Sequence, residues 1–264
     1  MKIFVEGVGV LGPGLCGWQA SKDILAGTAA YLETALVIPP NDLLPSAERR
    51  RTGPAVKIAL AVGSEAITHA QRNASELPSV FASSAGEGEN MCAIFEMLAA
   101  DGCEISPTRF HNSVHNAPSG YWSIATKSMA PSISLACYDD SFVAGLIEAA
   151  AQAYMGDDAV VLISYDSPYT HPVHAARPIC AGFGIGMVLT GNKTSRSLAE
   201  LEISINRKNS ASTPIATAQL ESLRLGIPAA RGLPLLAALA AHTQTQICIN
   251  YVAGNQVNIV VRPC

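Results

Sequence analysis

Charged residues are scarce in this sequence of 264 residues, in which Asp, Glu, Lys and Arg make up 14% and hydrophobic residues 49%. Globular domains usually contain about 25% charged residues. With a formal net charge of −4, the chain also lacks the basic excess with which proteins bind nucleic acid or anionic membranes. Because large exposed apolar patches usually mark interaction sites, this composition predicts an extensive interface with another subunit.

Long apolar runs are missing as well. No segment reaches the ~20 apolar residues that a transmembrane helix needs. The apolar start of the chain is interrupted by Glu6, too early for a secretory signal peptide. We therefore expect a cytoplasmic protein without a membrane span.

The sequence has no cysteine pattern typical of disulfide frameworks or metal sites. An odd number of cysteines without motif spacing favours reduced thiols. His171 and His174 stand three residues apart, but no cysteine or carboxylate completes a ligand set with the usual spacing. We expect neither a metal nor a resident cofactor. The seven cysteines are residues 16, 92, 103, 137, 180, 248 and 264.

The first half of the chain alternates between β-branched runs and segments with helical periodicity. Such alternation predicts layered α/β structure. The expected strands cover residues 2–11, 78–84 and 159–164, and the expected helices cover residues 18–26, 54–70 and 89–100.

The second half begins with a glycine-spaced strand over residues 178–190, for which residues 198–205 are the expected antiparallel neighbour. Two helices and a hairpin follow. The pair Gly254-Asn255 favours a tight turn between the two strands of the hairpin. The helices are expected over residues 219–225 and 233–241, and the hairpin strands over residues 247–252 and 256–261.

Two short motifs each have a functional and a structural interpretation. Glycines at positions 7, 9 and 12 could suggest a dinucleotide site, but no acidic residue follows a second strand about 20 residues on, as that motif requires. The three arginines at positions 49–51 could meet a phosphate on the phosphopantetheine arm of a carrier protein. More often such a basic run is a solvated helix end.

Cys137 lies where a strand over residues 132–136 ends and the next helix begins. The free amides and dipole of a helix N-terminus favour a thiolate there, but the charges of Asp139 and Asp140 oppose it. Both aspartates and Ser141 can cap the helix. The alternative is that Cys137 is a small buried hydrophobe.

These residues resemble the nucleophile region of the β-ketoacyl synthases, condensing enzymes with a thiolase fold. Residues 117–120, Ala-Pro-Ser-Gly, resemble their dimer-interface helix, and residues 132–137 resemble the strand that ends in the acyl-accepting cysteine. The segments 114–124 and 140–149 are most similar to the chain-length-factor-like proteins of aryl-polyene and related type II polyketide clusters. The resemblance implies one domain over residues 1–264 with a thiolase-like layered α-β-α-β-α fold and mixed sheets. It comprises a nucleophile half, 1–165, and a truncated second half, 166–264.

The resemblance also shows what this chain lacks. Condensing enzymes use two downstream histidines to stabilise the enolate formed by decarboxylation, and neither histidine motif has a match here. After Cys137 only His171, His174 and His242 remain. Ala253 stands at the position of the gating phenylalanine of the family, and Asn255 replaces the second glycine of its pair.

We therefore expect a non-catalytic, chain-length-factor-like subunit in which Cys137 is a vestigial nucleophile. Its partners would be a ketosynthase, as a heterodimer, and through it an acyl carrier protein that delivers the acyl chain on phosphopantetheine. The alternatives are a self-sufficient condensing enzyme or acyl transferase that uses Cys137, with His111 or His115 as base, and a homodimeric binding protein for acyl chains.

Helix residues 116–124 and strand residues 132–136 are expected to pair with the ketosynthase. The aromatic side chains near the two-fold axis would bound the acyl tunnel, with ordinary core packing as the alternative. The residues expected at the interface or tunnel are His115, Asn116, Ser119, Tyr121, Trp122, Tyr138 and Phe142.

Overall fold

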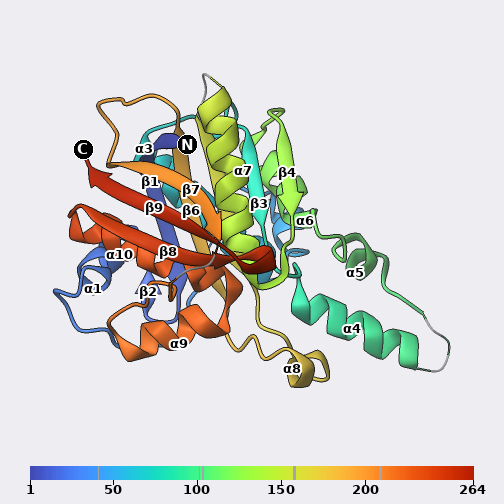
Figure 1. Cartoon of the computed structure of the whole chain (residues 1–264). Coiled ribbons are helices and arrows are strands. Elements are labelled where there is room, and N and C mark those ends of the chain that lie inside the picture. The colour runs from blue at the N-terminus through green and yellow to red at the C-terminus, as the bar shows by residue number, and fades with distance from the viewer. Residues whose placement is uncertain (41, 101, 103, 157–158, 208–209) are drawn as a thin grey trace.

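The strands form one mixed sheet in the computed structural model, which describes residues 1–40, 42–100, 102, 104–156, 159–207 and 210–264 (Figure 1). The order is β4-β3-β5-β6-β1-β7-β9-β8, and β2 pairs with β1. Strands β3, β4 and β5 are parallel to one another, whereas the remaining pairs are antiparallel. The strands are β1 (Lys2–Gly12), β2 (Leu15–Cys16), β3 (Ser79–Ala82), β4 (Ser132–Leu135), β5 (Val160–Asp166), β6 (Phe183–Thr190), β7 (Ala199–Arg207), β8 (Thr245–Tyr251) and β9 (Asn255–Pro263).

Helices cover both faces of this sheet. On one face, α3 and α6 pack on β3, β5 and β6, with Trp122 in the core between them. On the other face, α7 joins α1, α10 and the strands β7 to β9 in a second core. Their bounds are α1 (Trp18–Leu25), α3 (Pro54–Ala70), α6 (Ala117–Thr126), α7 (Ser141–Met155) and α10 (Leu233–Ala241).

The smaller helices lie in the connections. Figure 1 shows α4 and α5 projecting from the body of the molecule beside α6. No helix within the described ranges combines the length and apolar character needed to cross a membrane. These helices are α2 (Ser46–Arg49), α4 (Gly88–Ala99), α5 (Pro107–His111), α8 (Val173–Ala176) and α9 (Ala218–Gly226), with 3-10 turns η1 (Tyr138–Asp140), η2 (Pro228–Gly232) and η3 (Val252–Gly254).

The N-terminal glycines allow β1 to pack closely on α3. A Cβ atom added at Gly7 would lie 2.1 Å from the carbonyl oxygen of Ala66, and one added at Gly9 would lie 2.3 Å from that of Val62. Such distances are far below van der Waals contact, so only glycine fits at either position. The glycine series therefore has a packing role between strand and helix.

Most of the predicted elements are confirmed, and the largest error concerns a strand partner. Strand β7 does not pair with β6, because β1 lies between them and pairs with both. The strand expected from residue 178 begins only at Phe183. The hairpin is present, but Tyr251 pairs with Asn255, so the turn lies one residue earlier than predicted.

The parallel strands bring three chain segments to the same edge of the sheet. Strands β3, β4 and β5 point the same way, so their carboxyl ends lie together. Glu87 and Cys137 follow the ends of β3 and β4, and Asp166 is the last residue of β5. In sheets of this kind, ligands usually bind beyond the carboxyl ends of the strands.

Candidate functional site

Cys137 lies in a tight turn between β4 and α7. The backbone N–H of Cys137 donates to Oγ of Ser141 at 2.9 Å, and that hydroxyl donates to the carbonyl oxygen of Tyr138 at 2.7 Å. Tyr138 has a φ of 51°, in the left-handed region that non-glycine residues seldom adopt. Ser141 thus stabilises an unusual turn that presents Cys137 at the end of the strand.

The two aspartates after Cys137 form ion pairs. Asp140 is the N-cap residue of α7, as predicted, but its side chain makes no capping hydrogen bond to the helix. Asp139 lies 2.8 Å from a guanidinium nitrogen of Arg177 and 3.2 Å from one of Arg231, and Asp140 lies 3.0 Å from Arg231. The guanidinium of Arg177 also stacks 3.7 Å from the ring centroid of Tyr138. Two arginines therefore clamp the turn.

The environment of the thiol favours its neutral form. Cys137 is half-buried, and this burial, together with the charge of Asp140, raises its pKa. In the described part of the chain the thiol forms no hydrogen bond, since the hydrogen bonds of Cys137 involve only its backbone. A nucleophilic cysteine needs a lowered pKa, so this site lacks the electrostatic support of one.

The histidines lie elsewhere. His115 contacts the carbonyl oxygen of Ser83 through Nε2 at 3.0 Å, and the ring of His111 packs at 6.4 Å against that of Tyr121. His111 ends α5 and His115 lies beyond it, so the two do not share a helical face. Across the described ranges, no hydrogen bond joins any histidine to Cys137, and none contributes to its pKa shift.

The three histidines after Cys137 occupy connections rather than a site. His171 precedes α8 and His174 lies within it, and His242 is the left-handed residue that ends α10. Within the described residues, no group of three His, Cys, Asp or Glu side chains is arranged to hold a metal ion.

The aromatic residues expected at the tunnel fall into two groups. Trp122 and Phe142 are fully buried in the two cores, where the ring of Phe81 packs edge-on against Trp122. Tyr121 is buried and its hydroxyl donates to Asn112 at 3.0 Å. Tyr138, by contrast, is 64% exposed beside Cys137. The positions of Trp122 and Phe142 match core packing, whereas Tyr138 is free to contact a ligand or partner.

The remaining predicted interface residues shape the start of α6. Asn116 precedes the helix, and its carbonyl oxygen accepts from Oγ of Ser119 at 2.8 Å. Ser119 in turn accepts from Oγ of Ser134 on β4 at 3.3 Å. Of these three residues, Ser119 joins α6 to β4 through Ser134, whereas His115 bonds to Ser83 beyond β3 and Asn116 bonds within the start of α6.

A buried carboxylate that the sequence analysis missed joins the two halves of the chain. Asp166 is completely buried and accepts hydrogen bonds from Ser83, from the amide and hydroxyl of Ser84, and from the amide of Ala229. Burial raises its pKa, and these donors counteract the rise. The position of Asp166 at the end of the buried strand β5 could have signalled a role in the interior.

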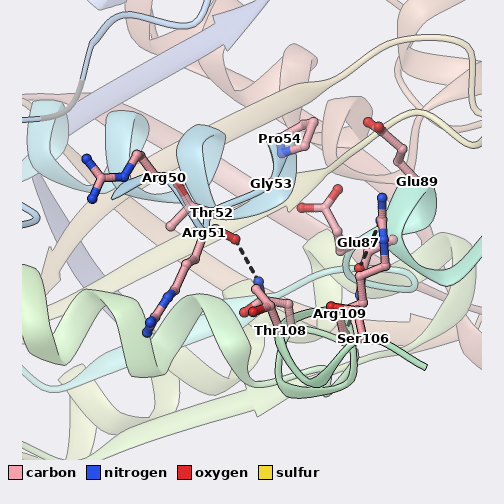
Figure 2. A pocket seen from close by; sticks show the side chains of 12 residues that line it. Arg50, Arg51, Thr52, Gly53, Pro54, Glu87, Glu89, Ser106, Thr108 and Arg109 are labelled. Atoms are coloured by element: carbon pink, nitrogen blue, oxygen red, sulfur yellow. Dashed lines mark hydrogen bonds between the residues drawn. The ribbon is translucent and has the colours of Figure 1, made fainter. Parts of the chain in front are cut away.

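A second carboxylate, Glu87, borders a cavity of about 410 Å³ (Figure 2). Its Oε2 accepts the backbone N–H of Ala55 at 2.9 Å, at the start of α3, while its Oε1 has no hydrogen-bond partner among the residues that the structure describes. Burial raises the pKa of Glu87 to about 7. Arg50 and Arg51 also line the cavity, but Figure 2 shows their side chains directed away from Glu87. These arginines follow the short helix α2 as exposed residues, as expected of a solvated helix end.

An unpaired strand edge and an apolar face lie next to Cys137. Strand β4 is at the end of the sheet and pairs only with β3 among the described strands. Ile133 on this strand is 40% exposed, Ile124 on α6 is 48% exposed and Met129 between them is 96% exposed. A groove of about 500 Å³ between α5 and α6 continues this face. Isolated chains rarely expose such a combination without a partner.

The family model described as "Beta-ketoacyl synthase, N-terminal domain" matches residues 18–250. The chain therefore belongs to the β-ketoacyl synthase N-terminal domain family. No curated protein matches the sequence.

Solved structures of ketosynthases with their partners are similar in fold. A ketosynthase (ApeO) in complex with its chain length factor (ApeC) from Xenorhabdus doucetiae matches with a TM-score of 0.74 and 20% identity, over 98% of this chain and 99% of that chain. The ishigamide ketosynthase/chain length factor matches with a TM-score of 0.71 and 15% identity, over 100% and 99%. A type II polyketide synthase acyl carrier protein in complex with its ketosynthase bound to the hexaketide matches with a TM-score of 0.76 and 11% identity, over 100% and 99%. These likenesses confirm the predicted thiolase-like fold class.

Proposed function

We propose that this chain is a non-catalytic, chain-length-factor-like subunit that pairs with an active ketosynthase. The observation that carries the proposal is the environment of Cys137. Its thiol pKa is raised, and within the described residues no imidazole hydrogen-bonds to it. The role fits the family of the chain, whose nucleophile position it retains.

The chemistry of condensation explains why this environment matters. Decarboxylation of a malonyl thioester places negative charge on the thioester oxygen, and hydrogen-bond donors must stabilise that charge. Removal of one such donor typically costs about 100- to 1,000-fold in rate. A site that offers a neutral thiol and no imidazole donors gives no support for useful turnover, so the carbon–carbon bond would be formed on the partner.

The apolar face supports a heterodimer. Two of the similar structures are ketosynthases with their chain length factors, and a third is a ketosynthase with its acyl carrier protein. For this chain we propose the same kind of assembly, with β4 and α6 as the interface. The acyl chain would arrive on the phosphopantetheine of a carrier protein bound to the ketosynthase. The assembly would act in the cytoplasm, in an aryl-polyene or related biosynthetic pathway.

Within that assembly, Tyr138 is the best candidate for a residue that bounds the acyl tunnel. Its ring is exposed and held by Arg177, so it presents a rigid wall beside the residue 137 position. Trp122 and Phe142 would act indirectly, since both are buried in the cores on which α6 and α7 rest.

Reconstitution tests the proposal. The ketosynthase of the same gene cluster should elongate a carrier-bound acyl chain with this protein present and lose elongation, or chain-length control, without it. The Cys137→Ala variant should support elongation as well as the unmodified chain does.

The rival activity has a distinct signature. If this chain alone becomes acylated on Cys137 by an acyl carrier protein substrate, as mass spectrometry would detect, and Cys137→Ala abolishes turnover, the protein is an enzyme and the proposal is wrong.

A further inference from the structure

Glu65, in the middle of α3, caps the start of a different helix. The backbone N–H of Trp18, the first residue of α1, donates to Oε1 of Glu65, and that of Val10 on β1 donates to Oε2 at 3.0 Å. Gly17, the N-cap residue of α1, offers no side-chain acceptor, and a Cβ atom there would lie 2.8 Å from Oε1. Because two donors on different elements each need an oxygen, a carboxylate suits this position, whereas an amide has only one acceptor oxygen.

The negative charge that this cap brings has no counter-ion in the described part of the chain. Among the described residues, no lysine or arginine forms an ion pair with Glu65. His69, one turn further along α3, instead accepts the backbone N–H of Val8 through Nδ1 at 3.1 Å. Burial raises the pKa of Glu65, and only the two backbone hydrogen bonds counteract the rise. An ionised carboxylate in such a place is stabilised by a cation that can reach it.

An apolar cavity of about 420 Å³ opens beside this carboxylate. It lies between α3, the paired strands β1 and β2, and the connection around residues 37–39. Of the described residues that line the cavity, Glu65 alone is charged, and Val10 and Val62 form part of the apolar walls. Val37 also lines the cavity and is 67% exposed, so a ligand could enter from solvent. This volume, an apolar lining and a single polar group are typical of small-molecule sites.

The chemistry of the lining indicates the class of ligand. An ionised carboxylate can accept about four hydrogen bonds, and the two backbone donors leave the remaining lone pairs of Glu65 for another donor. An ammonium group provides both the donors and the missing positive charge, in a charge-assisted hydrogen bond. The apolar walls favour a hydrocarbon body on that group, whereas a ligand with its own carboxylate would be repelled.

We propose that this cavity binds a small organic amine, with its ammonium group on Glu65 and its apolar body between α3 and residues 37–39. The site goes beyond the function proposed above. It lies on β1, which β3, β5 and β6 separate from β4 and the turn at Cys137. Binding of the amine therefore does not require the ketosynthase.

Three ligands with the same hydrocarbon chain and different charge test the proposal on the unmodified protein. Hexylamine, 1-hexanol and hexanoate are compared by isothermal titration at pH 8. Hexylamine should bind about 10- to 100-fold more tightly than 1-hexanol, because hydrogen bonds between charged groups are stronger than those that involve a neutral donor. Hexanoate should bind least. Equal affinity for hexylamine and 1-hexanol, or no binding of hexylamine, would overturn the proposal.

Cys16 gives a site-resolved readout, since it lines the same cavity and is exposed. Saturating hexylamine should slow the modification of Cys16 by iodoacetamide, measured by peptide mass spectrometry, and 1-hexanol at the same concentration should slow it far less. Cys264, which is exposed after β9, is the internal control. Equal protection of both thiols would place the amine elsewhere and contradict the proposal.

Two substitutions separate the charge from the cavity. Glu65→Gln removes the charge and should abolish the preference for hexylamine over 1-hexanol; because it also removes one acceptor of the cap, its melting temperature is measured alongside. Ala61→Phe keeps the cap and fills the cavity from α3, so it should abolish binding of both ligands. Thr68→Phe is the matched control, since Thr68 is exposed on α3 and does not line the cavity. Full binding in Ala61→Phe would overturn the proposal, and none of these outcomes bears on the pairing with a ketosynthase.

Discussion

Carboxylates near the carboxyl ends of the parallel strands differ in how their charge is balanced. Asp139 and Asp140 form ion pairs with arginines, and Asp166 accepts hydrogen bonds from serine hydroxyls and backbone amides. Glu87 accepts a backbone N–H through one oxygen, and its other oxygen has no hydrogen-bond partner among the described residues. Burial without a close cation disfavours the charged form of a carboxylate. Asp139 and Asp140 therefore hold the turn at Cys137, whereas Glu87 titrates near neutral pH.

The buried carboxylate of Glu87 should make the protein less stable as the pH rises from about 4.5 to 7. Its folded pKa of about 7 exceeds the ordinary glutamate value of 4.5, so the folded state holds a proton that the unfolded state releases, and the stabilisation is lost as pH rises through the folded pKa. The neighbouring charges that act on it are Glu89, which raises the pKa, and Lys57, which lowers it. In Glu87→Gln this pH dependence should largely disappear, with a gain at pH 8 on the order of 3 kcal/mol relative to the unmodified chain.

Urea denaturation at pH 5 and pH 8 measures this effect. The control is Glu96→Gln, which changes an exposed side chain on α4 that does not act on the pKa of Glu87, so the pH dependence should be kept. Equal pH dependence in the unmodified chain and in Glu87→Gln would show that Glu87 does not titrate as described.

Arg231 should be a main support of the turn at Cys137, since it pairs with both aspartates. In Arg231→Met the carboxylate of Asp140, whose side chain is only 19% exposed, loses its cation. Loss of a partly buried hydrogen-bonded charge pair typically costs about 2 kcal/mol. Arg262→Met, which removes two more exposed pairs on β7 and β9, should have little effect. Thermal unfolding of both variants at pH 7 measures the two losses of stability. Equal losses in Arg231→Met and Arg262→Met would contradict the proposed clamp.

Helices α6 and α7 have similar hydrophobic periodicity, but the apolar residues of α7 form a core, whereas α6 also presents apolar residues at the surface. α7 is packed against β5, β3, β6 and η2, so its apolar residues belong to a core. α6 buries Tyr121 and Trp122 on one side and exposes Ile124 on the other. The exposed side of α6 is therefore available to another subunit, while α7 is committed to the fold.

Aromatic residues of the two kinds should respond differently to truncation. Phe142→Ala removes a fully buried ring at the start of α7 and should cost about 3–5 kcal/mol in the free energy of unfolding. Tyr138→Ala removes an exposed ring and should change stability far less, while it alters the length of the product made by the reconstituted pair. Denaturant titration and product analysis by mass spectrometry measure these two effects. A product distribution unaffected by Tyr138→Ala would remove Tyr138 from the tunnel.

The whole molecule is asymmetric, with an unpaired strand at one end of its sheet. β4 pairs only with β3 among the described strands, and it presents Ser132 and Ile133 at the surface (Figure 1). Exposed edge strands are usually protected by charge, proline or a bulge. β4 has no charged residue, and its free edge is best explained by pairing in an assembly.

A charge on this strand should prevent that assembly without harming the isolated chain. Ile133→Lys places an ammonium group at a position that is already 40% exposed, so the monomer should fold normally, while co-purification with the ketosynthase should be lost. Ile205→Lys is the control, because Ile205 is 47% exposed on β7, toward the other end of the sheet. Retention of the pair in Ile133→Lys, measured by size-exclusion chromatography with light scattering, would exclude β4 from the interface.

The order of the larger elements, and the segment that carries the family resemblance, could be predicted from local patterns in the sequence. Their apolar residues repeat with a period of two or about 3.6, and this pattern is local, so β1, α3 and β5 could be located within a few residues. The short helices α2, α5 and α8 escaped prediction because too few residues form each of them to show a period.

The groups that surround Cys137 come from distant parts of the chain and could be identified only from the three-dimensional structure. Arg177 and Arg231 follow Asp139 and Asp140 by 38 and 91 positions in the chain, so no local pattern could show that arginines clamp the turn. The burial of Glu87, the position of β1 between β6 and β7 and the free edge of β4 likewise depend on strand order. Electrostatic pairing and burial act through space, whereas periodicity acts along the chain, and for this reason the fold class was predictable from the sequence while the environment of Cys137 was not.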